Sequence, residues 1–271
     1  MTELQEKMFK MFSWFHNFCT QNNLRYYAVG GTALGAVRHQ GFIPWDDDMD
    51  VGMPRRDYNK LIELMKNKTE FAPYTLETPL EKNDFVYPYC KLYDTTTTLI
   101  ENTRYKTKRG IYIDVFPLDG AGNSLAESKK RFRLIDGKIN LLSTKTCALS
   151  SHRKLYKNLA IMFLRCIPEC ILSWKKIVRQ INVLGEELVF DDCVYVSNFV
   201  GNWHEKEIMK REWFGEPRLV KFENAEMYIP QDYDAYLTQL YGNYMQLPPE
   251  EKRKSHHDYL YQNLNESYIE I

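Results

Sequence analysis

Apolar residues recur at helical spacing in the first part of the chain. Thr2 is followed three positions later by Gln5, the pattern of a capping box in which two side chains satisfy backbone N–H groups of the first turn. The pattern therefore predicts an amphipathic helix over residues 2–19. Its apolar face would consist of Leu4, Met8, Met11, Phe12, Phe15 and Cys19.

Short strand-like and helical patterns alternate over the next hundred residues. Strands are predicted at 26–29, 48–53, 87–93 and 111–116, with a helix at 32–39 and another that starts at Pro54. In the second of these strands, Asp48 and Asp50 would lie on one face and Met49 and Val51 on the other, because side chains alternate along a strand. A half-buried strand is expected there.

The pattern turns helical from about residue 124 to residue 185. Its most apolar part, residues 159–172, is short for a membrane span and contains Arg165, Pro168 and Glu169. We expect a buried or interfacial helix pair, with a plain core helix favoured. Lys and Arg residues around the apolar stretch leave contact with a membrane surface as the alternative. Strands near 190–200 and 219–229, a helix at 233–241 and a basic segment at 252–257 follow.

These elements predict an α+β fold, with a small mixed sheet flanked by helices. A chain of 271 residues can form one domain with an elaboration. We expect a catalytic core at 1–120, a mainly helical insertion at 121–200 and a C-terminal segment at 201–271 that packs on the core.

Composition limits the partners and the compartment. Lys plus Arg and Asp plus Glu both number 36, so the formal net charge is zero and nothing favours nucleic acid as a partner. Six scattered cysteines are typical of reduced thiols rather than of a disulfide framework. With no secretory signal at the start of the chain, we expect a cytoplasmic protein, with peripheral contact at the inner membrane face as a further expectation.

The acidic run at residues 46–50 is the main candidate for chemistry. Asp48 and Asp50, two positions apart on a strand, could share a divalent cation, and Mg²⁺ (or Mn²⁺) prefers a few carboxylates together with substrate phosphate oxygens. Asp114 is embedded in another apolar strand and could complete the metal site. The alternative is a solvated acidic turn. Asp46 and Asp47 rank second, as capping or steering residues.

A glycine turn precedes the acidic run. Gly30, Gly31 and Thr32 lie at a predicted strand-to-helix junction, where glycines let the backbone approach a phosphate that the helix N-terminus favours. Arg38, further along that helix, could also reach a phosphate. A tight turn and a surface salt bridge are the respective alternatives.

Three segments together resemble the LicD family of phosphotransferases. They are YAVGGTALGAVRHQGFIPWDDDMDVGMPRRDY at 27–58, IYIDVFPLD at 111–119, and LYGNYMQLPPEEKR at 240–253 followed by His256 and His257. The resemblance implies a nucleotidyltransferase fold with Gly30, Gly31, Asp48, Asp50 and Asp114 as motif positions. Residues from about 121 to 200 resemble the family least.

The resemblance also implies a reaction, the transfer of a phospho-alcohol to a hydroxyl of a glycan or lipid-linked glycan acceptor. The commonest donor would be CDP-choline, with CMP as the leaving group, and the acceptor would be teichoic acid, lipopolysaccharide or capsule. Asp114 would complete the metal site or accept the hydroxyl proton. Arg38, His256 and His257 would contact the phosphate or the leaving group, with Lys91 as a weaker candidate; for the two histidines, a polar surface tail is the alternative. Aromatic side chains could hold choline, although the sequence does not identify which.

Two other functions fit parts of the pattern. A glycosyltransferase would also use an Asp-x-Asp metal clamp, but the glycine turn close upstream argues against the longer βαβ region of a sugar-nucleotide fold. A nucleotide-binding protein without catalysis is the other alternative, against which the intact carboxylates argue.

Overall fold

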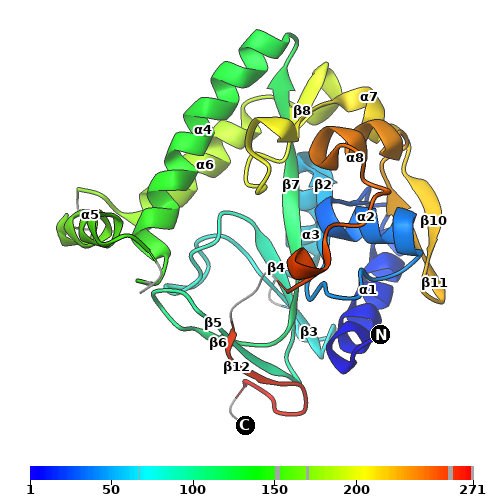
Figure 1. The fold of residues 1–271 in the computed structure, drawn as a ribbon, viewed down its shortest axis with the longest axis horizontal. Coiled ribbons are helices and arrows are strands. Elements are labelled where there is room, and N and C mark those ends of the chain that lie inside the picture. Colours follow the sequence, from blue (N-terminus) through cyan, green and yellow to red (C-terminus); the bar gives the residue numbers. More distant parts are fainter. Residues whose placement is uncertain (67, 150–152, 169–170, 256–258, 270–271) are drawn as a thin grey trace.

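The chain forms an α+β fold, as predicted (Figure 1). The structure is a computed structural model and describes residues 1–66, 68–149, 153–168, 171–255 and 259–269. The helices are α1 (Glu3–Gln21), α2 (Gly30–His39), α3 (Arg55–Met65), α4 (Leu125–Thr146), α5 (Leu155–Cys166), α6 (Trp174–Glu186), α7 (Arg211–Phe214) and α8 (Tyr233–Tyr241). Short 3-10 helices lie at Phe190–Asp192, His204–Glu207 and Glu250–Lys252.

The strands form a central sheet and two small ones. They are β1 (Tyr27–Ala28), β2 (Asp50–Pro54), β3 (Tyr74–Glu77), β4 (Cys90–Asp94), β5 (Thr98–Glu101), β6 (Lys108–Arg109), β7 (Tyr112–Gly122), β8 (Tyr195–Ser197), β9 (Ile208–Lys210), β10 (Arg218–Phe222), β11 (Ala225–Ile229) and β12 (Tyr259–Asn263). The central sheet has the order β1-β2-β7-β4-β3, and β8 and β9 extend it along the far half of β7. Strands β2 and β7 are parallel, and the other pairs of this sheet are antiparallel.

Helix α1 confirms the capping box and the apolar face predicted for it. The Thr2 hydroxyl accepts from the Gln5 backbone N–H at 3.2 Å, and the Gln5 side chain accepts from the Thr2 N–H at 2.9 Å. Met8, Met11 and Phe15 are buried in the main hydrophobic core beneath the sheet strands. Hydrophobic burial of this face therefore fixes α1 against the core.

Some predicted strand boundaries were wrong. β2 begins at Asp50 rather than at residue 48, because the Asp50 N–H donates to the Thr32 hydroxyl at 2.8 Å and its carbonyl accepts from the Val29 N–H, whereas residues 46–49 belong to no helix or strand. Pro54 ends β2 and caps α3 rather than starting the helix. β7 continues to Gly122, further than predicted, and all of its residues are buried.

Helix α5 does not form the core helix predicted for that segment. A second hydrophobic core lies between α4 and α6, and α5 contributes no residue to it or to the main core among the described residues. Most of its large apolar side chains are exposed. In Figure 1, α5 lies at the far end of α4, away from the central sheet. Among the described residues, no helix combines the length and apolarity that a membrane crossing needs.

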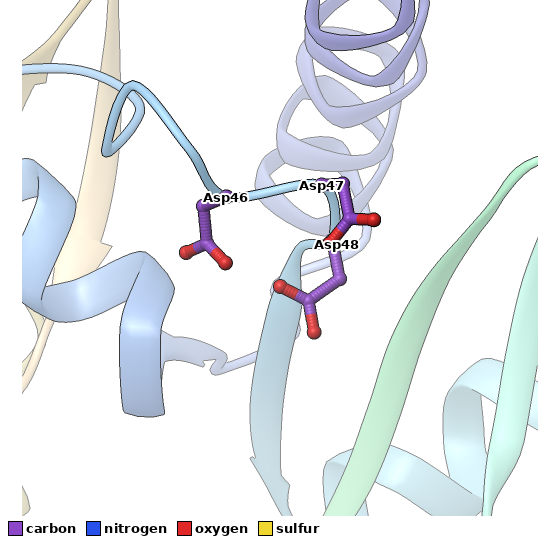
Figure 2. A group of neighbouring side chains, drawn as sticks. All are labelled: Asp46, Asp47 and Asp48. Atoms are coloured by element: carbon purple, nitrogen blue, oxygen red, sulfur yellow. The ribbon is translucent and has the colours of Figure 1, made fainter. Parts of the chain in front are cut away.

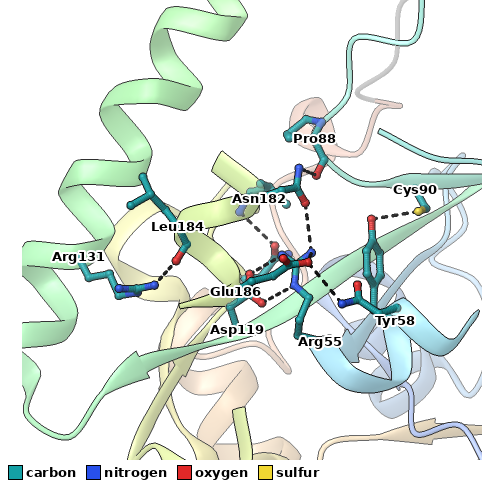
Figure 3. Close-up of polar contacts among 12 residues, drawn as sticks. Arg55, Tyr58, Pro88, Cys90, Asp119, Arg131, Asn182, Leu184 and Glu186 are labelled. Atoms are coloured by element: carbon teal, nitrogen blue, oxygen red, sulfur yellow. Dashed lines mark hydrogen bonds and ion pairs between the residues drawn. The ribbon is translucent and has the colours of Figure 1, made fainter. Parts of the chain in front are cut away.

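A buried ion pair joins α3, β7 and α6 (Figure 3). The Arg55 guanidinium donates to both oxygens of Asp119, each at 2.7 Å, and its third nitrogen donates to Asn182 at 3.1 Å. The Asn182 amide in turn donates to the Pro88 carbonyl at 3.2 Å. Bidentate geometry and the additional polar partner satisfy charges that would otherwise be costly to bury.

Candidate active site

A cavity of about 920 Å³ lies where residues from both ends of the chain meet. Its walls come from α2, the acidic run, the loop before the 3-10 helix at 204–207, and the segment that follows α8. They are Gly31, Leu34, Arg38, Ile43, Trp45, Asp46, Asp48, Asp50, Asn202, Trp203, Tyr241, Asn243, Tyr244, Gln246, Leu247, Pro248, Pro249 and Lys252. The fold thus brings the predicted glycine turn, acidic run and Arg38 to one place.

The acidic run follows a turn at residues 44–45 and is held by helix α1. The Gln5 side-chain amide donates to the Asp46 carbonyl at 3.0 Å and to the Ile43 carbonyl at 3.2 Å. Asp46, Asp47 and Asp48 each offer a carboxylate oxygen within 4.8 Å of the others (Figure 2). Such clustering of half-buried carboxylates suits a divalent cation.

Asp50, Asp114 and Lys91 form a row across three adjacent strands. In the sheet register, Asp50 of β2 lies opposite Asp114 of β7, which lies opposite Lys91 of β4. The Lys91 ammonium is 2.9 Å from the Asp114 carboxylate and 3.5 Å from that of Glu101. It also lies 3.3 Å from the centroid of the Tyr112 ring. Lys91 therefore contacts protein carboxylates in the sheet, and it is not among the residues that line the cavity.

The row has raised carboxyl pKa values. Burial raises the pKa of Asp50 well above its usual range, and the neighbouring charges of Asp48, Asp114 and Asp46 raise it further. Burial also raises the pKa of Asp114 to about 6, although the Lys91 ammonium beside it acts in the opposite direction. Carboxylates thus outnumber the positive groups that face them here, and a bound cation would relieve their repulsion. The residues fit a Mg²⁺ ion.

The glycine turn has the conformation that its sequence favours. Gly30 adopts a positive φ of 56°, which a side chain would strain, and its N–H donates to the Tyr236 hydroxyl at 3.0 Å. A Cβ on Gly31 would lie 2.9 Å from an Asp46 carboxylate oxygen, so the absence of a side chain lets Asp46 approach α2. Thr32 is buried and accepts from the Asp50 N–H, and thereby ties α2 to β2.

Two basic side chains line the cavity among the described residues. The Arg38 guanidinium donates to the Tyr244 carbonyl at 2.8 Å, which orients it across the cavity wall. Lys252 lines the cavity from the 3-10 helix at 250–252. The predicted phosphate contacts His256 and His257 lie outside the described residues. Arg38 and Lys252 are therefore the cations placed to meet an anionic substrate.

Aromatic side chains on the cavity wall were not identified from the sequence. Trp45, Trp203, Tyr241 and Tyr244 all line it. The rings of Trp203 and Tyr241 meet edge to face with centroids 4.7 Å apart. Tyr241 and Tyr244 lie within the 240–253 segment that carries the family resemblance, so the motif could have indicated them as site residues. Trp203 comes from a part of the chain with no recognised motif.

Glu207 is a buried carboxyl beside the Trp203 loop. It accepts from the Trp203 N–H at 3.4 Å, and burial raises its pKa from 4.5 to about 8. The folded protein therefore holds the proton more tightly than the unfolded chain does. The stability that this group contributes is fully present below pH 4.5 and is lost as the pH rises towards 8.

Replacing Glu207 with glutamine should remove this pH dependence. We expect Glu207→Gln to be more stable than the wild type at pH 8, by on the order of a few kcal/mol, with the difference shrinking as the pH falls to 5. Urea denaturation at several pH values measures it, with the exposed Glu216→Gln as control. A stability difference that does not change with pH would contradict the prediction.

The sequence of the chain is similar to a family model and to a known protein. A family model described as LicD/FKTN/FKRP, nucleotidyltransferase domain, matches residues 23–133, which include the glycine turn, the acidic run and Asp114. The lipopolysaccharide cholinephosphotransferase LicD of Haemophilus influenzae is 30% identical, over 99% of this chain and 98% of that protein.

Two further relatives match shorter parts. An uncharacterized protein of Rickettsia prowazekii is 41% identical over 29% of this chain and 36% of that protein, and one of Rickettsia typhi is 55% identical over 16% and 14%. The H. influenzae relative spans nearly the whole of both chains and includes the helical segment that resembled the family least. On this full-length similarity, the chain belongs to the LicD family.

Proposed function

We propose that this protein transfers phosphocholine from CDP-choline to a hydroxyl of a cell-surface glycan precursor, releases CMP and requires Mg²⁺. The name of its H. influenzae relative, a lipopolysaccharide cholinephosphotransferase, supports the phosphocholine and makes a lipopolysaccharide precursor the first acceptor to test. The observation that carries the proposal is the cavity, in which carboxylates, cations and aromatic rings line one space.

The walls of the cavity match the parts of a CDP-alcohol. The N-terminus of α2 at Gly31 favours phosphate, and Arg38 and Lys252 add positive charge. Trp45, Trp203 and Tyr241 offer ring faces and edges, and ring faces attract a quaternary ammonium through cation–π interactions. The neighbouring carboxylates add to that attraction because choline is positively charged.

The carboxylates would supply the site for the metal. Asp48 and Asp50 line the cavity, and Asp114 lies beside Asp50 in the sheet. When bound there, Mg²⁺ would withdraw charge from the diphosphate oxygens and favour departure of CMP. In the reaction, the acceptor hydroxyl oxygen attacks the phosphorus that bears choline, and the bond from that phosphorus to CMP breaks. Asp114 would complete the metal site or accept the hydroxyl proton.

A donor screen tests the proposal. The purified protein would be incubated with Mg²⁺, a choline-free lipopolysaccharide acceptor and, in turn, CDP-choline, CDP-ethanolamine, CDP-glycerol, CDP-ribitol or a UDP-sugar, and the released nucleotide measured. We expect CMP release to be fastest with CDP-choline and to stop when EDTA removes the metal. Because the aromatic wall distinguishes a trimethylammonium from a primary ammonium, CDP-ethanolamine should be the poorer donor.

Other results of the donor screen would favour a different function or a different donor. UDP release from a UDP-sugar would favour a glycosyltransferase. Release that is fastest with CDP-glycerol or CDP-ribitol would retain the reaction but contradict the choline assignment. Binding of CDP-choline without CMP release with any acceptor, including teichoic acid and capsule precursors, would favour a nucleotide-binding protein.

A further inference from the structure

Helix α5 turns one apolar face away from the protein. Its exposed large side chains stand at positions i, i+1, i+4, i+7 and i+8, so they share one side of the helix. They are Leu155, Tyr156, Leu159, Met162 and Phe163. Leu155 is 74% exposed and Phe163 72%. Such a contiguous apolar face marks an interaction surface rather than ordinary scatter.

The other side of α5 is anchored. Ile161 is buried, and Arg165 donates to the Cys147 carbonyl at the end of α4. The buried Lys145 ammonium of α4 donates to the Leu172 carbonyl at 2.7 Å, beyond the end of α5. These bonds hold α5 against α4 with its apolar face outward, so the exposure belongs to the docked helix.

Charge is distributed unevenly between this region and the rest of the chain. Residues 137–185 contain nine Lys and Arg residues and one acidic residue, whereas the remaining chain contains 27 basic and 35 acidic residues. The segment therefore carries a formal charge of +8 within a neutral chain. Lys154 and Lys157, at the start of α5, are exposed, and α5 itself contains no acidic residue.

We propose that α5 lies flat on an anionic membrane surface, with its apolar face in the boundary between headgroups and acyl chains. The flanking lysines would lie at the level of the lipid phosphates, where each basic group adds to binding. Residues 155–166 are too few to cross a bilayer, so the helix rests in the plane of the membrane.

Charge also favours a lipid surface over a second copy of the chain as the partner of the apolar face of α5. A second copy docked through this face would bring Lys154 and Lys157 of one chain close to the same residues of the other, and that repulsion opposes self-association. An anionic lipid surface supplies the opposite charge together with an apolar layer, and so satisfies both features of α5 at once.

Vesicle sedimentation tests the proposal with the full chain. The wild-type protein should sediment with vesicles of phosphatidylcholine and phosphatidylglycerol, and much less with pure phosphatidylcholine or at high salt. The double variant Leu159→Ser/Phe163→Ser should bind at least about tenfold more weakly, because two exposed apolar side chains are lost. Lys154→Glu/Lys157→Glu should weaken binding to the anionic vesicles. Leu219→Ser, which removes an exposed leucine on β10, serves as the matched control and should bind like the wild type.

Three results would overturn the proposal. One is wild-type protein that stays in the supernatant with both kinds of vesicle. Another is unchanged binding by the α5 double variant. The third is a wild-type dimer in sedimentation equilibrium that the same double variant converts to a monomer, which would assign the face to a second copy. The altered side chains lie outside the cavity, so CMP release should be unchanged with a water-soluble acceptor. This readout separates loss of membrane binding from misfolding.

Discussion

Replacing Asp50 with asparagine should lower the rate of CMP release by about a hundred- to a thousandfold. The carboxylate lines the cavity beside Asp48 and Asp114, and asparagine has nearly the same shape but lacks the charge that would hold the metal. The hydrogen bond to Thr32 uses the backbone N–H of Asp50, so it remains in the variant. The fold should therefore be kept while the chemistry is lost.

The stability of Asp50→Asn distinguishes this explanation from simple damage. Because the pKa of Asp50 is raised in the folded protein, its ionised form opposes folding at neutral pH, and asparagine removes that cost. Without metal, the variant should unfold at the same urea concentration as the wild type or at a higher one. The exposed Asp192→Asn serves as control. An Asp50→Asn protein with full turnover would contradict the proposed metal site.

Replacing Arg55 with methionine should cost about 3–5 kcal/mol of stability. Asp119 is only 2% exposed, and the variant would leave its carboxylate buried without the guanidinium that now binds both of its oxygens. Urea denaturation would measure the loss. The neighbouring Arg56 is exposed, and Arg56→Met should change stability little.

A double variant tests the reason for that loss. In Arg55→Met/Asp119→Leu both charges of the ion pair are gone. Most of the stability should therefore return, even though the hydrogen bonds between the two side chains are lost. If the double variant is as unstable as Arg55→Met alone, packing around this site, rather than the uncompensated charge, determines the effect.

Local signals account for the elements that were predicted well. The Thr2 capping box and the apolar face located α1, and the helical pattern at 233–241 matched α8. Strands β5, β6 and β12 were not predicted, because Thr98–Glu101 pairs with Tyr259–Asn263 across more than half of the chain and its nearby partner Lys108–Arg109 is only 2 residues long. Pairing over such distances leaves little local pattern in the sequence.

The candidate site was predicted in part. The glycine turn and acidic run could be found because their chemistry lies in short segments, and Arg38 lies close by. The burial of Lys91 beside Asp114 could not be foreseen, since it depends on the register between β4 and β7. The prediction of a core helix at α5 was wrong. Apolar residues at helical spacing predict a helix, but they do not show whether another part of the chain covers its apolar face.

The cavity walls also have an order of synthesis. Gly31 and Asp50 are translated well before Tyr241, Tyr244 and Lys252. Until that C-terminal segment emerges from the ribosome, water can hydrate the clustered carboxylates and screen their repulsion. The sheet can therefore form around them before the segment closes the cavity. A chain released shortly before residue 240 would keep the acidic run, Trp45 and Trp203 but lack Tyr241 and Tyr244 of the cavity wall.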